Sequence, residues 1–278
     1  MPPTLKELEQ IVISAARTEL LPRFNEVSHS RKSDGSILTE ADLAMQNHVQ
    51  QALEQRWPEY VLLGEEMEET RQLQLLTGEH EGLWCLDPLD GTSNFAVGIP
   101  LFAASLALIV KGEVVMGLVY DPVRNECFTA QKGVGAWLNG EPLKQQTVVP
   151  SLAQSIGIID FKRLPSELAR RLAGERPYSS QRSFGSVALD WCWIAAGSGH
   201  IYLHGKQKLW DYVAGVLILD EAGGHSVTLE GEPVYRPTLQ GRSAVAALDK
   251  RLFQAWVNWL KIEESAENSI SGISSTSK

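Results

Sequence analysis

Acidic residues follow two apolar stretches of the chain that the sequence predicts as buried strands. Glu65 and Glu66 end the first stretch, and Asp87 and Asp90 end the second. Because the ends of interior strands meet at a shared edge of a sheet, we expect these carboxylates to gather there. Two like charges about 4 Å apart repel by about 4 kcal/mol at an effective dielectric constant of about 20. A cation would offset this repulsion, and carboxylate and carbonyl oxygens favour Mg²⁺, Mn²⁺ or Ca²⁺ over zinc.

The residues around Asp90 add a second chemical signal. Pro88 fixes its own φ and lacks an N–H, so it predicts a sharp exit from the strand. Gly91 allows a backbone amide to approach an anion closely. Thr92 and Ser93 are suited to open a helix whose first amides receive a phosphate. A cation site followed at once by a phosphate-binding turn indicates phosphoryl-transfer chemistry.

Two further aspartates lie where helices are expected to begin. Asp211 follows Trp210 at the start of an apolar helix, and such an aspartate is commonly an N-cap. Thr39 and Asp42 resemble a capping box at the start of another helix.

The elements that must position these residues follow from hydrophobic spacing and turn residues. Helices are predicted over 4–22, 39–57, 166–172, 185–196 and 210–222, with a polar loop over 28–36. Strands are predicted over 60–63, 82–86, 103–110, 114–120, 126–131 and 155–159, and a turn leading into a strand over 197–203. Helices followed by consecutive strands favour an α+β fold with a mixed or antiparallel sheet. We expect an N-terminal domain over 1–145, a C-terminal domain over 146–262, and a polar, disordered tail over 263–278.

Composition excludes several classes of protein. Of 278 residues, 44% are hydrophobic and 21% charged, which excludes a disordered chain, a collagen and a coiled-coil rod. The net charge of −9 makes nucleic acid and anionic membranes poor partners. The three cysteines have no metal-binding spacing, and the longest apolar run, 99–110, is too short to cross a membrane. We therefore expect a cytoplasmic protein, and the phosphoryl-transfer signal above makes a small phosphorylated metabolite its expected partner.

Three motifs in this order resemble those of the inositol monophosphatase family. They are Gly64-Glu65-Glu66, the segment from Asp87-Pro88-Leu89-Asp90-Gly91-Thr92 to Phe95, and Trp210-Asp211-Tyr212-Val213-Ala214-Gly215. The family belongs to the Mg²⁺-dependent, Li⁺-sensitive phosphatases, beside bisphosphate nucleotidases and fructose-1,6-bisphosphatases. The resemblance implies a layered αβαβα sandwich, usually a homodimer, that holds two or three Mg²⁺ ions, with Mn²⁺ as a substitute.

The same resemblance implies roles for individual residues. The implied metal ligands are Glu65, Asp87, the Leu89 carbonyl, Asp90 and Asp211. Glu65 and Thr92 would activate a water molecule, with Asp42 holding the Thr92 hydroxyl and Lys32 lying near the third metal. Gly91, Thr92 and Ser93 would bind phosphate, and Gly185, Ser186 and Val187 would line the alcohol pocket.

One segment departs from the family pattern. Inositol-specific members carry a glutamate shortly before the Trp-Asp motif, whereas 202–209 contains no acidic residue here. His204, Lys206 and Lys208 lie there instead, either as a site for a second anionic group or as a solvated basic loop.

We therefore predict hydrolysis of a small phosphomonoester by a metal-activated water. A bisphosphate-specific enzyme, of the fructose-1,6-bisphosphatase or 3′,5′-bisphosphate nucleotidase type, and a regulatory protein that binds a macromolecule remain alternatives. An aspartyl-phosphate phosphatase fits less well, since its Asp-x-Asp-x-Thr loop is one residue shorter than Asp87–Thr92. The acidic charge disfavours a nuclease.

Overall fold

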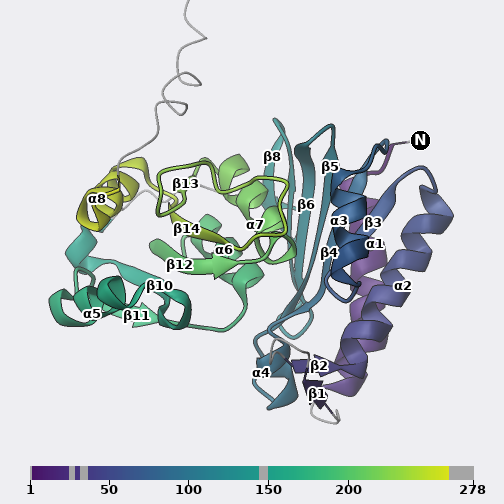
Figure 1. Cartoon of the computed structure of the whole chain (residues 1–278), viewed down its shortest axis with the longest axis horizontal. Helices are drawn as coiled ribbons and strands as arrows, with labels where there is room; N and C mark the ends of the chain where they lie inside the picture. The colour runs from purple at the N-terminus through teal and green to yellow at the C-terminus, as the bar shows by residue number, and fades with distance from the viewer. Residues whose placement is uncertain (1, 25–28, 32–36, 144–149, 263–278) are drawn as a thin grey trace, which may run out of the picture.

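The structure is a computed structural model that describes residues 2–24, 29–31, 37–143 and 150–262. Within these residues, two large sheets and three helical layers alternate (Figure 1). The expected tail, 263–278, and the expected domain boundary near 145 lie outside the described residues. The two-domain division therefore stays a prediction.

The N-terminal helices begin at capping boxes. Helix α1 (Leu5–Ala15) is capped by Thr4 and Glu7, and α2 (Glu40–Arg56) by Thr39 and Asp42. The capping box at the second helix is therefore confirmed. The helix predicted over 4–22 is shorter than expected, because a π-helical turn and a 3₁₀ turn containing Pro22 follow α1.

The first sheet has seven strands in the order β3-β4-β5-β6-β7-β8-β9. Only β3 and β4 pair in parallel, so the sheet is mixed as predicted. Its strands are β3 (Val61–Gly64), β4 (Leu83–Asp90), β5 (Ala103–Val110), β6 (Glu113–Asp121), β7 (Glu126–Gln131), β8 (Gly135–Leu138) and β9 (Glu141–Pro142). Two short helices follow β3 and β4, namely α3 (Glu69–Thr77) and α4 (Thr92–Ala96).

Strand β4 is longer than predicted. It continues to Asp90, since Asp87 pairs with Ser105 and Asp90 with Ala103 across an irregularity that contains Pro88. The sequence predicted that the strand ends at this proline. The strand instead continues through it, and the register irregularity between Asp87 and Asp90 provides the bend.

The second sheet has five strands in the order β11-β10-β12-β14-β13. They are β10 (Ile156–Asp160), β11 (Ser180–Arg182), β12 (Ile201–Gln207), β13 (His225–Val227) and β14 (Arg242–Ala247). The remaining helices are α5 (Ser166–Glu175), α6 (Val187–Ala195), α7 (Leu209–Glu221) and α8 (Lys250–Leu260). A small hairpin pairs β1 (His29–Arg31) with β2 (Ile37–Thr39), so the loop predicted over 28–36 contains a short strand.

Alternating side chains of the first sheet bury its two faces against different helices. Trp84 and Leu86 join the core that packs on α1 and α2, whereas Leu83 and Cys85 join the core that packs on α6 and α7. The second sheet covers the other side of α6 and α7 and packs its outer face on α5 and α8 (Figure 1). This arrangement confirms the αβαβα sandwich.

Two expectations from composition concern residues within the described ranges. Cys85, Cys127 and Cys192 are all buried and form no disulfide. None of the helices in the described part of the chain has the length and apolar character that a membrane span requires.

Candidate active site

Acidic side chains from three elements line one pocket. Glu65 follows β3, Asp87 and Asp90 lie on β4, and Asp211 lies in the first turn of α7. The pocket has a volume of about 340 Å³ and also contains Leu89 in its wall. The structure therefore brings together the residues that the sequence grouped as metal ligands.

Glu65 is positioned by the parallel pairing of β3 and β4. Its N–H donates to the Leu86 carbonyl at 3.1 Å, which extends the ladder by one residue beyond β3. The Gln72 side-chain amide donates to the Gly64 and Glu65 carbonyls at 2.9 and 3.1 Å. Helix α3 thus fixes the turn that carries the glutamate.

The two aspartates of β4 are held by different parts of the chain. Asp87 is 1% exposed, and its Oδ1 accepts from the Leu89 N–H at 3.0 Å. Asp90 Oδ2 accepts from the Ser186 hydroxyl at 2.5 Å and from the Ala188 N–H at 2.7 Å. The N-terminus of α6 therefore orients Asp90.

Asp211 is the third residue of α7. The sequence had suggested that it is the N-cap, and this was wrong. Lys208 is at the N-cap, and its N–H donates to Asp211 Oδ2 at 2.7 Å. The Ser105 hydroxyl of β5 donates to the Trp210 carbonyl at 3.2 Å and ties the start of α7 to the first sheet.

Burial and mutual repulsion disfavour negative charge in this pocket. The pKa of Asp87 lies well above its usual range because of burial, reinforced by Glu65, Asp90 and Asp211. Burial also raises the pKa of Asp211, again with contributions from Asp90 and Glu65. Burial raises the pKa of Asp90 to about 6, although its hydrogen bonds from α6 oppose the increase. A bound cation would let these groups ionise together.

The turn after β4 adopts a backbone that requires glycine. Gly91 has φ +92°, and a Cβ there would lie 2.8 Å from the Leu101 carbonyl oxygen. Thr92 follows, and its hydroxyl lies 2.9 Å from the Leu89 carbonyl oxygen and 3.2 Å from Asp42 Oδ1. Gly91, Thr92 and Ser93 all line the pocket, as expected for a phosphate-binding turn.

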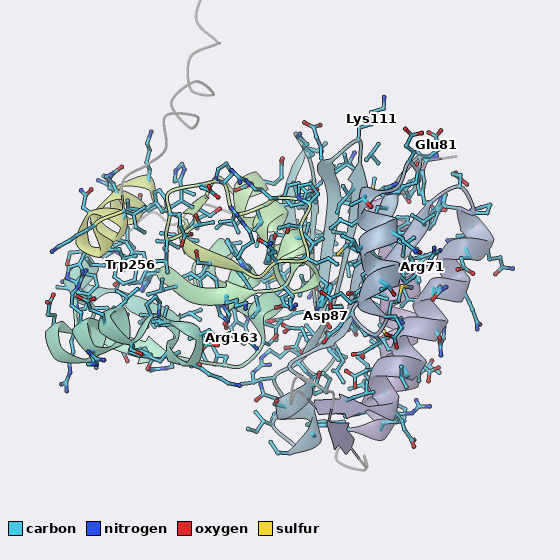
Figure 2. All side chains as sticks on the ribbon, in the orientation of Figure 1. Arg71, Glu81, Asp87, Lys111, Arg163 and Trp256 are labelled. Carbon is cyan, nitrogen blue, oxygen red and sulfur yellow. The ribbon has the colours of Figure 1, made fainter. Side chains whose placement is uncertain are left out.

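The opposite wall comes from the second sheet and α6. The predicted residues Gly185, Ser186, Val187 and His204 lie in this wall. Arg163, from the turn after β10, lines the same pocket as Asp87 of the first sheet, and Figure 2 labels both residues. The sequence analysis did not single out several polar residues of this wall: Asp160, Lys162, Arg163, Ser183 and Asp190.

A family model described as the inositol monophosphatase family matches residues 3–261. This chain belongs to the inositol monophosphatase family. The match covers both sheets and all three helical layers, and family membership supports a phosphatase.

Individual relatives of this inositol monophosphatase family member carry two kinds of name. Inositol monophosphatase 1 of Solanum lycopersicum is 33% identical over 271 residues, covering 94% of this chain and 97% of its own. A protein of Pasteurella multocida named Nus factor SuhB is 34% identical over 207 residues, covering 73% and 75%. A solved IMPase of Thermotoga maritima has a TM-score of 0.78 at 25% identity, covering 92% of this chain and 97% of its own.

Two predicted residues of this family member do not lie in the pocket. Lys206 and Lys208 line a different hollow, beside Glu69, Leu73 and Leu239. The segment expected as a basic loop is part of β12, and an irregularity between His204 and Gln207 interrupts the alternation of side chains. We therefore leave both lysines out of the candidate site. Lys32 lies outside the described residues.

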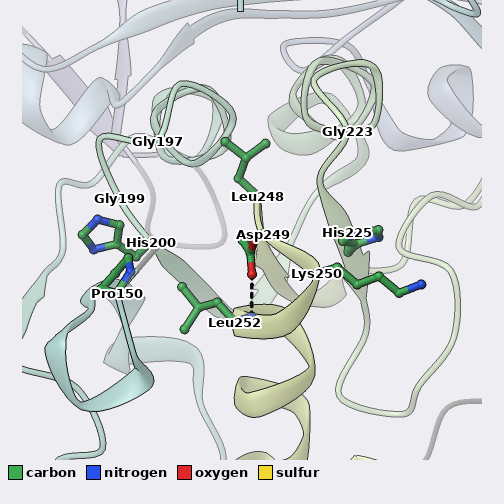
Figure 3. A pocket seen from close by; sticks show the side chains of 10 residues that line it. All are labelled: Pro150, Gly197, Gly199, His200, Gly223, His225, Leu248, Asp249, Lys250 and Leu252. Carbon is green, nitrogen blue, oxygen red and sulfur yellow. Dashed lines mark hydrogen bonds between the residues drawn. The ribbon is translucent and has the colours of Figure 1, made fainter. Parts of the chain in front are cut away.

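A smaller cavity, of about 150 Å³, lies near the N-terminus of α8 (Figure 3). Its polar groups already take part in the fold: Asp249 caps α8, and His200 Nδ1 accepts from the Ile156 N–H at 2.8 Å. Because the lining of this cavity lacks a cluster of carboxylates like that of the larger pocket, we assign catalysis to the larger pocket.

Proposed function

We propose that this protein is a Mg²⁺-dependent phosphatase that hydrolyses a phosphomonoester of a small alcohol or sugar. One observation carries the proposal. Four carboxylates that repel one another converge beside a turn that contains Gly91 at positive φ and the hydroxyl of Thr92. Such a site fits a cation and a phosphate together better than either alone.

The donor set suits Mg²⁺. Glu65, Asp87, Asp90, Asp211 and the Leu89 carbonyl supply only oxygen, which is the ligand type that Mg²⁺ and Mn²⁺ prefer. Within the described residues, no group of three or more Asp, Glu, His or Cys side chains could hold a metal ion by itself as the side chains stand. The carbonyl and water would complete the coordination, since Mg²⁺ keeps several waters in proteins. Two or three Mg²⁺ ions held there would activate water and neutralise the phosphate and the departing alkoxide.

The residues of the chain would position the reactants. Glu65 and Thr92 orient and deprotonate the attacking water, and Asp42 fixes the threonine hydroxyl. The amides of Gly91, Thr92 and Ser93 face the phosphate oxygens. The wall formed by Gly185, Ser186 and Val187 contacts the alcohol, and His204 lies in the same wall.

We also propose a homodimer. Three apolar side chains are exposed on one face: Val97 by 67%, Ile99 by 43% and Val123 by 41%. The Arg124 guanidinium joins them, since it donates to the Pro100 carbonyl at 3.2 Å and lies 5.6 Å from the Trp193 ring centroid. A second copy of the chain would cover this surface, which we call the Val97 patch.

The proposal is tested by phosphate release from inositol 1-phosphate with Mg²⁺, with EDTA, and with Mg²⁺ plus Li⁺. Activity should require Mg²⁺ and fall with Li⁺. Asp90→Asn should reduce turnover by at least about 100-fold, because it removes charge at the metal site. Near-normal turnover of a folded Asp90→Asn protein would falsify the assignment. A panel with fructose 1,6-bisphosphate and adenosine 3′,5′-bisphosphate tests the bisphosphate alternative.

A regulatory role is the second candidate, because the Pasteurella multocida relative is named a Nus factor. It requires binding of a macromolecule that persists when catalysis is removed. Asp90→Asn protein that still binds a protein or RNA partner as well as the unmodified chain would support it.

A further inference from the structure

One carboxylate of the pocket wall lies directly across from His204. Asp160 ends β10, and its Cα is the register partner of His204 on the parallel strand β12. The two side chains meet, with His204 Nε2 3.1 Å from Asp160 Oδ2. Because both residues line the pocket, the second sheet supplies an acid here from the strand next to β12.

The polar atoms of His204 are already used within the protein. Its ring is 2% exposed, and Nδ1 accepts from the Lys206 N–H at 3.2 Å. This hydrogen bond assigns the ring proton to Nε2, which donates it to Asp160. The ring also stacks on Tyr202, with centroids 6.3 Å apart. His204 therefore holds Asp160 and has no free nitrogen for a ligand.

Asp160, in contrast, retains hydrogen-bonding capacity. Its Oδ1 accepts from the Lys162 N–H at 2.7 Å, and its Oδ2 accepts from His204. These bonds from described residues occupy two of about four lone-pair positions. The side chain is 25% exposed, so a ligand in the pocket can reach it. Burial opposes ionisation, yet the hydrogen bond from His204, together with the hydrogen bond from the Lys162 N–H and the nearby Arg163 charge, lowers the pKa of Asp160.

The position of Asp160 depends on a close backbone approach. The 3₁₀ turn Phe161–Arg163 follows it and lies against Gly205, where a Cβ would collide with the Arg163 carbonyl oxygen. Glycine at this position of β12 therefore allows the turn to place Asp160 and Arg163 in the same wall.

The wall around Asp160 contains a second acid and two bases. Apart from the four carboxylates of the metal site, the described pocket residues include the acids Asp160 and Asp190 and the bases Lys162 and Arg163. The Asp190 Oδ1 atom is buried without a hydrogen-bond partner among the described residues. Burial raises the pKa of Asp190 well above its usual range, so Asp160 is the acid of this wall that carries charge beside Lys162 and Arg163. Its unused lone pairs are the acceptors that a hydroxyl group in the pocket can reach.

We propose that Asp160, positioned by His204, accepts hydrogen bonds from hydroxyl groups of the alcohol part of the substrate. The substrate is then a phosphate ester of a polyol that keeps free hydroxyls near the ester. This inference rests on the proposed phosphatase function of the pocket. Asp160 is a specificity-determining residue, and His204 is a positioning residue.

The test compares inositol 1-phosphate with p-nitrophenyl phosphate, which has no hydroxyl groups on its leaving group. Asp160→Asn should raise the KM for inositol 1-phosphate about 10- to 100-fold and change both constants for p-nitrophenyl phosphate less than about twofold. His204→Ala should also raise the KM for inositol 1-phosphate and change both constants for p-nitrophenyl phosphate much less. Lys206→Ala, an exposed lysine of β12 outside the pocket, is the matched control and should leave both substrates within about twofold. Thermal melts establish that each variant is folded.

The outcomes separate this inference from the function it rests on. Absence of any Mg²⁺-dependent phosphatase activity in the unmodified protein overturns the function and the inference together. Activity that Asp160→Asn leaves unchanged, or lowers equally for both substrates, overturns the inference alone.

Discussion

The Thr92 hydroxyl lies 3.2 Å from Asp42 Oδ1, although the two residues are 50 positions apart in the chain. Asp42 Oδ2 accepts from the Thr39 N–H at 2.7 Å and from the Thr39 hydroxyl at 2.6 Å. One carboxylate oxygen therefore caps α2, and the other orients a hydroxyl at the pocket. A helix start in the first layer is thereby connected to the proposed reaction centre.

Thr92→Val should remove the hydroxyl that Asp42 orients while preserving the shape of the side chain. We expect kcat to fall at least about 100-fold, because general-base assistance contributes 10² to 10⁴ in such reactions. The KM should change less than about threefold, since the phosphate still meets the same backbone amides. Steady-state kinetics measure both constants. Thr92→Ser keeps the hydroxyl and should retain most activity, and a valine variant as active as the serine variant would contradict the role.

Gly91→Ala should destabilise the protein and reduce its activity. Alanine would adopt φ +92° and place its Cβ 2.8 Å from the Leu101 carbonyl oxygen, at a cost of about 1 to 3 kcal/mol. Gly112→Ala is a matched control, because Gly112 also has positive φ (+78°) but no atom within 4 Å of the added Cβ. Thermal melts should show a larger loss for Gly91→Ala. Equal losses would mean that backbone strain alone, and not contact with Leu101, matters.

Without metal, the carboxylates should make the folded protein less stable as the pH rises. The pKa of Asp90 is about 6 in the folded protein against an ordinary value of 3.8, so between these values the folded state binds more protons than the unfolded state. The free energy of unfolding therefore decreases as the pH rises from about 4 to about 6. In EDTA, the melting temperature should fall more between about pH 4.5 and pH 7 for the unmodified protein than for Asp90→Asn.

Mg²⁺ should oppose this loss, because it binds the ionised carboxylates and competes with protons. The increase in melting temperature on adding Mg²⁺ should be larger at about pH 7 than at about pH 4.5. An equal increase at both values, or none at either, would contradict cation binding by these groups.

The convergence of Glu65, Asp87 and Asp90 could be predicted from the sequence, whereas Asp211 was added to them through the family resemblance. Glu65 and Asp87 each follow a short apolar run, and parallel pairing of β3 with β4 brings two such ends together. The αβαβα fold also followed, through the resemblance of three motifs to a known family. These signals depend on neighbours in the chain and not on the register between distant strands.

The opposite wall could not be predicted in the same way. Asp160 lies across from His204 only because of the β10–β12 register, and that register is not encoded in either segment alone. Asp190 is an isolated acid within the apolar helix α6, where sequence offers no sign that it faces a pocket. The prediction that Lys206 lines the pocket was wrong. In a regular strand, residues two positions apart lie on the same face, but the irregularity in β12 breaks this alternation between His204 and Gln207.

Val97→Arg should convert the proposed dimer to a monomer. Val97 is 67% exposed, so the substitution costs little in the folded monomer but places a charge in the centre of the Val97 patch. Light scattering after gel filtration should give about twice the chain mass of 30.7 kDa for the unmodified protein and the chain mass for the variant. Val134→Arg is the matched control, since Val134 is 61% exposed in the turn between β7 and β8, far from α4 (Figure 1).

The same substitution should also affect catalysis, because one side chain joins the patch to the pocket. The Asn94 amide donates to the Leu101 carbonyl at 2.8 Å and to the Phe184 carbonyl at 2.7 Å, directly before Gly185. Loss of a partner from 97–101 would loosen this connection, so we expect Val97→Arg to raise the KM several-fold while Val134→Arg leaves it unchanged. A Val97→Arg monomer with an unaltered KM would show that the pocket is complete within one chain, and a dimer that resists the substitution would place the interface elsewhere.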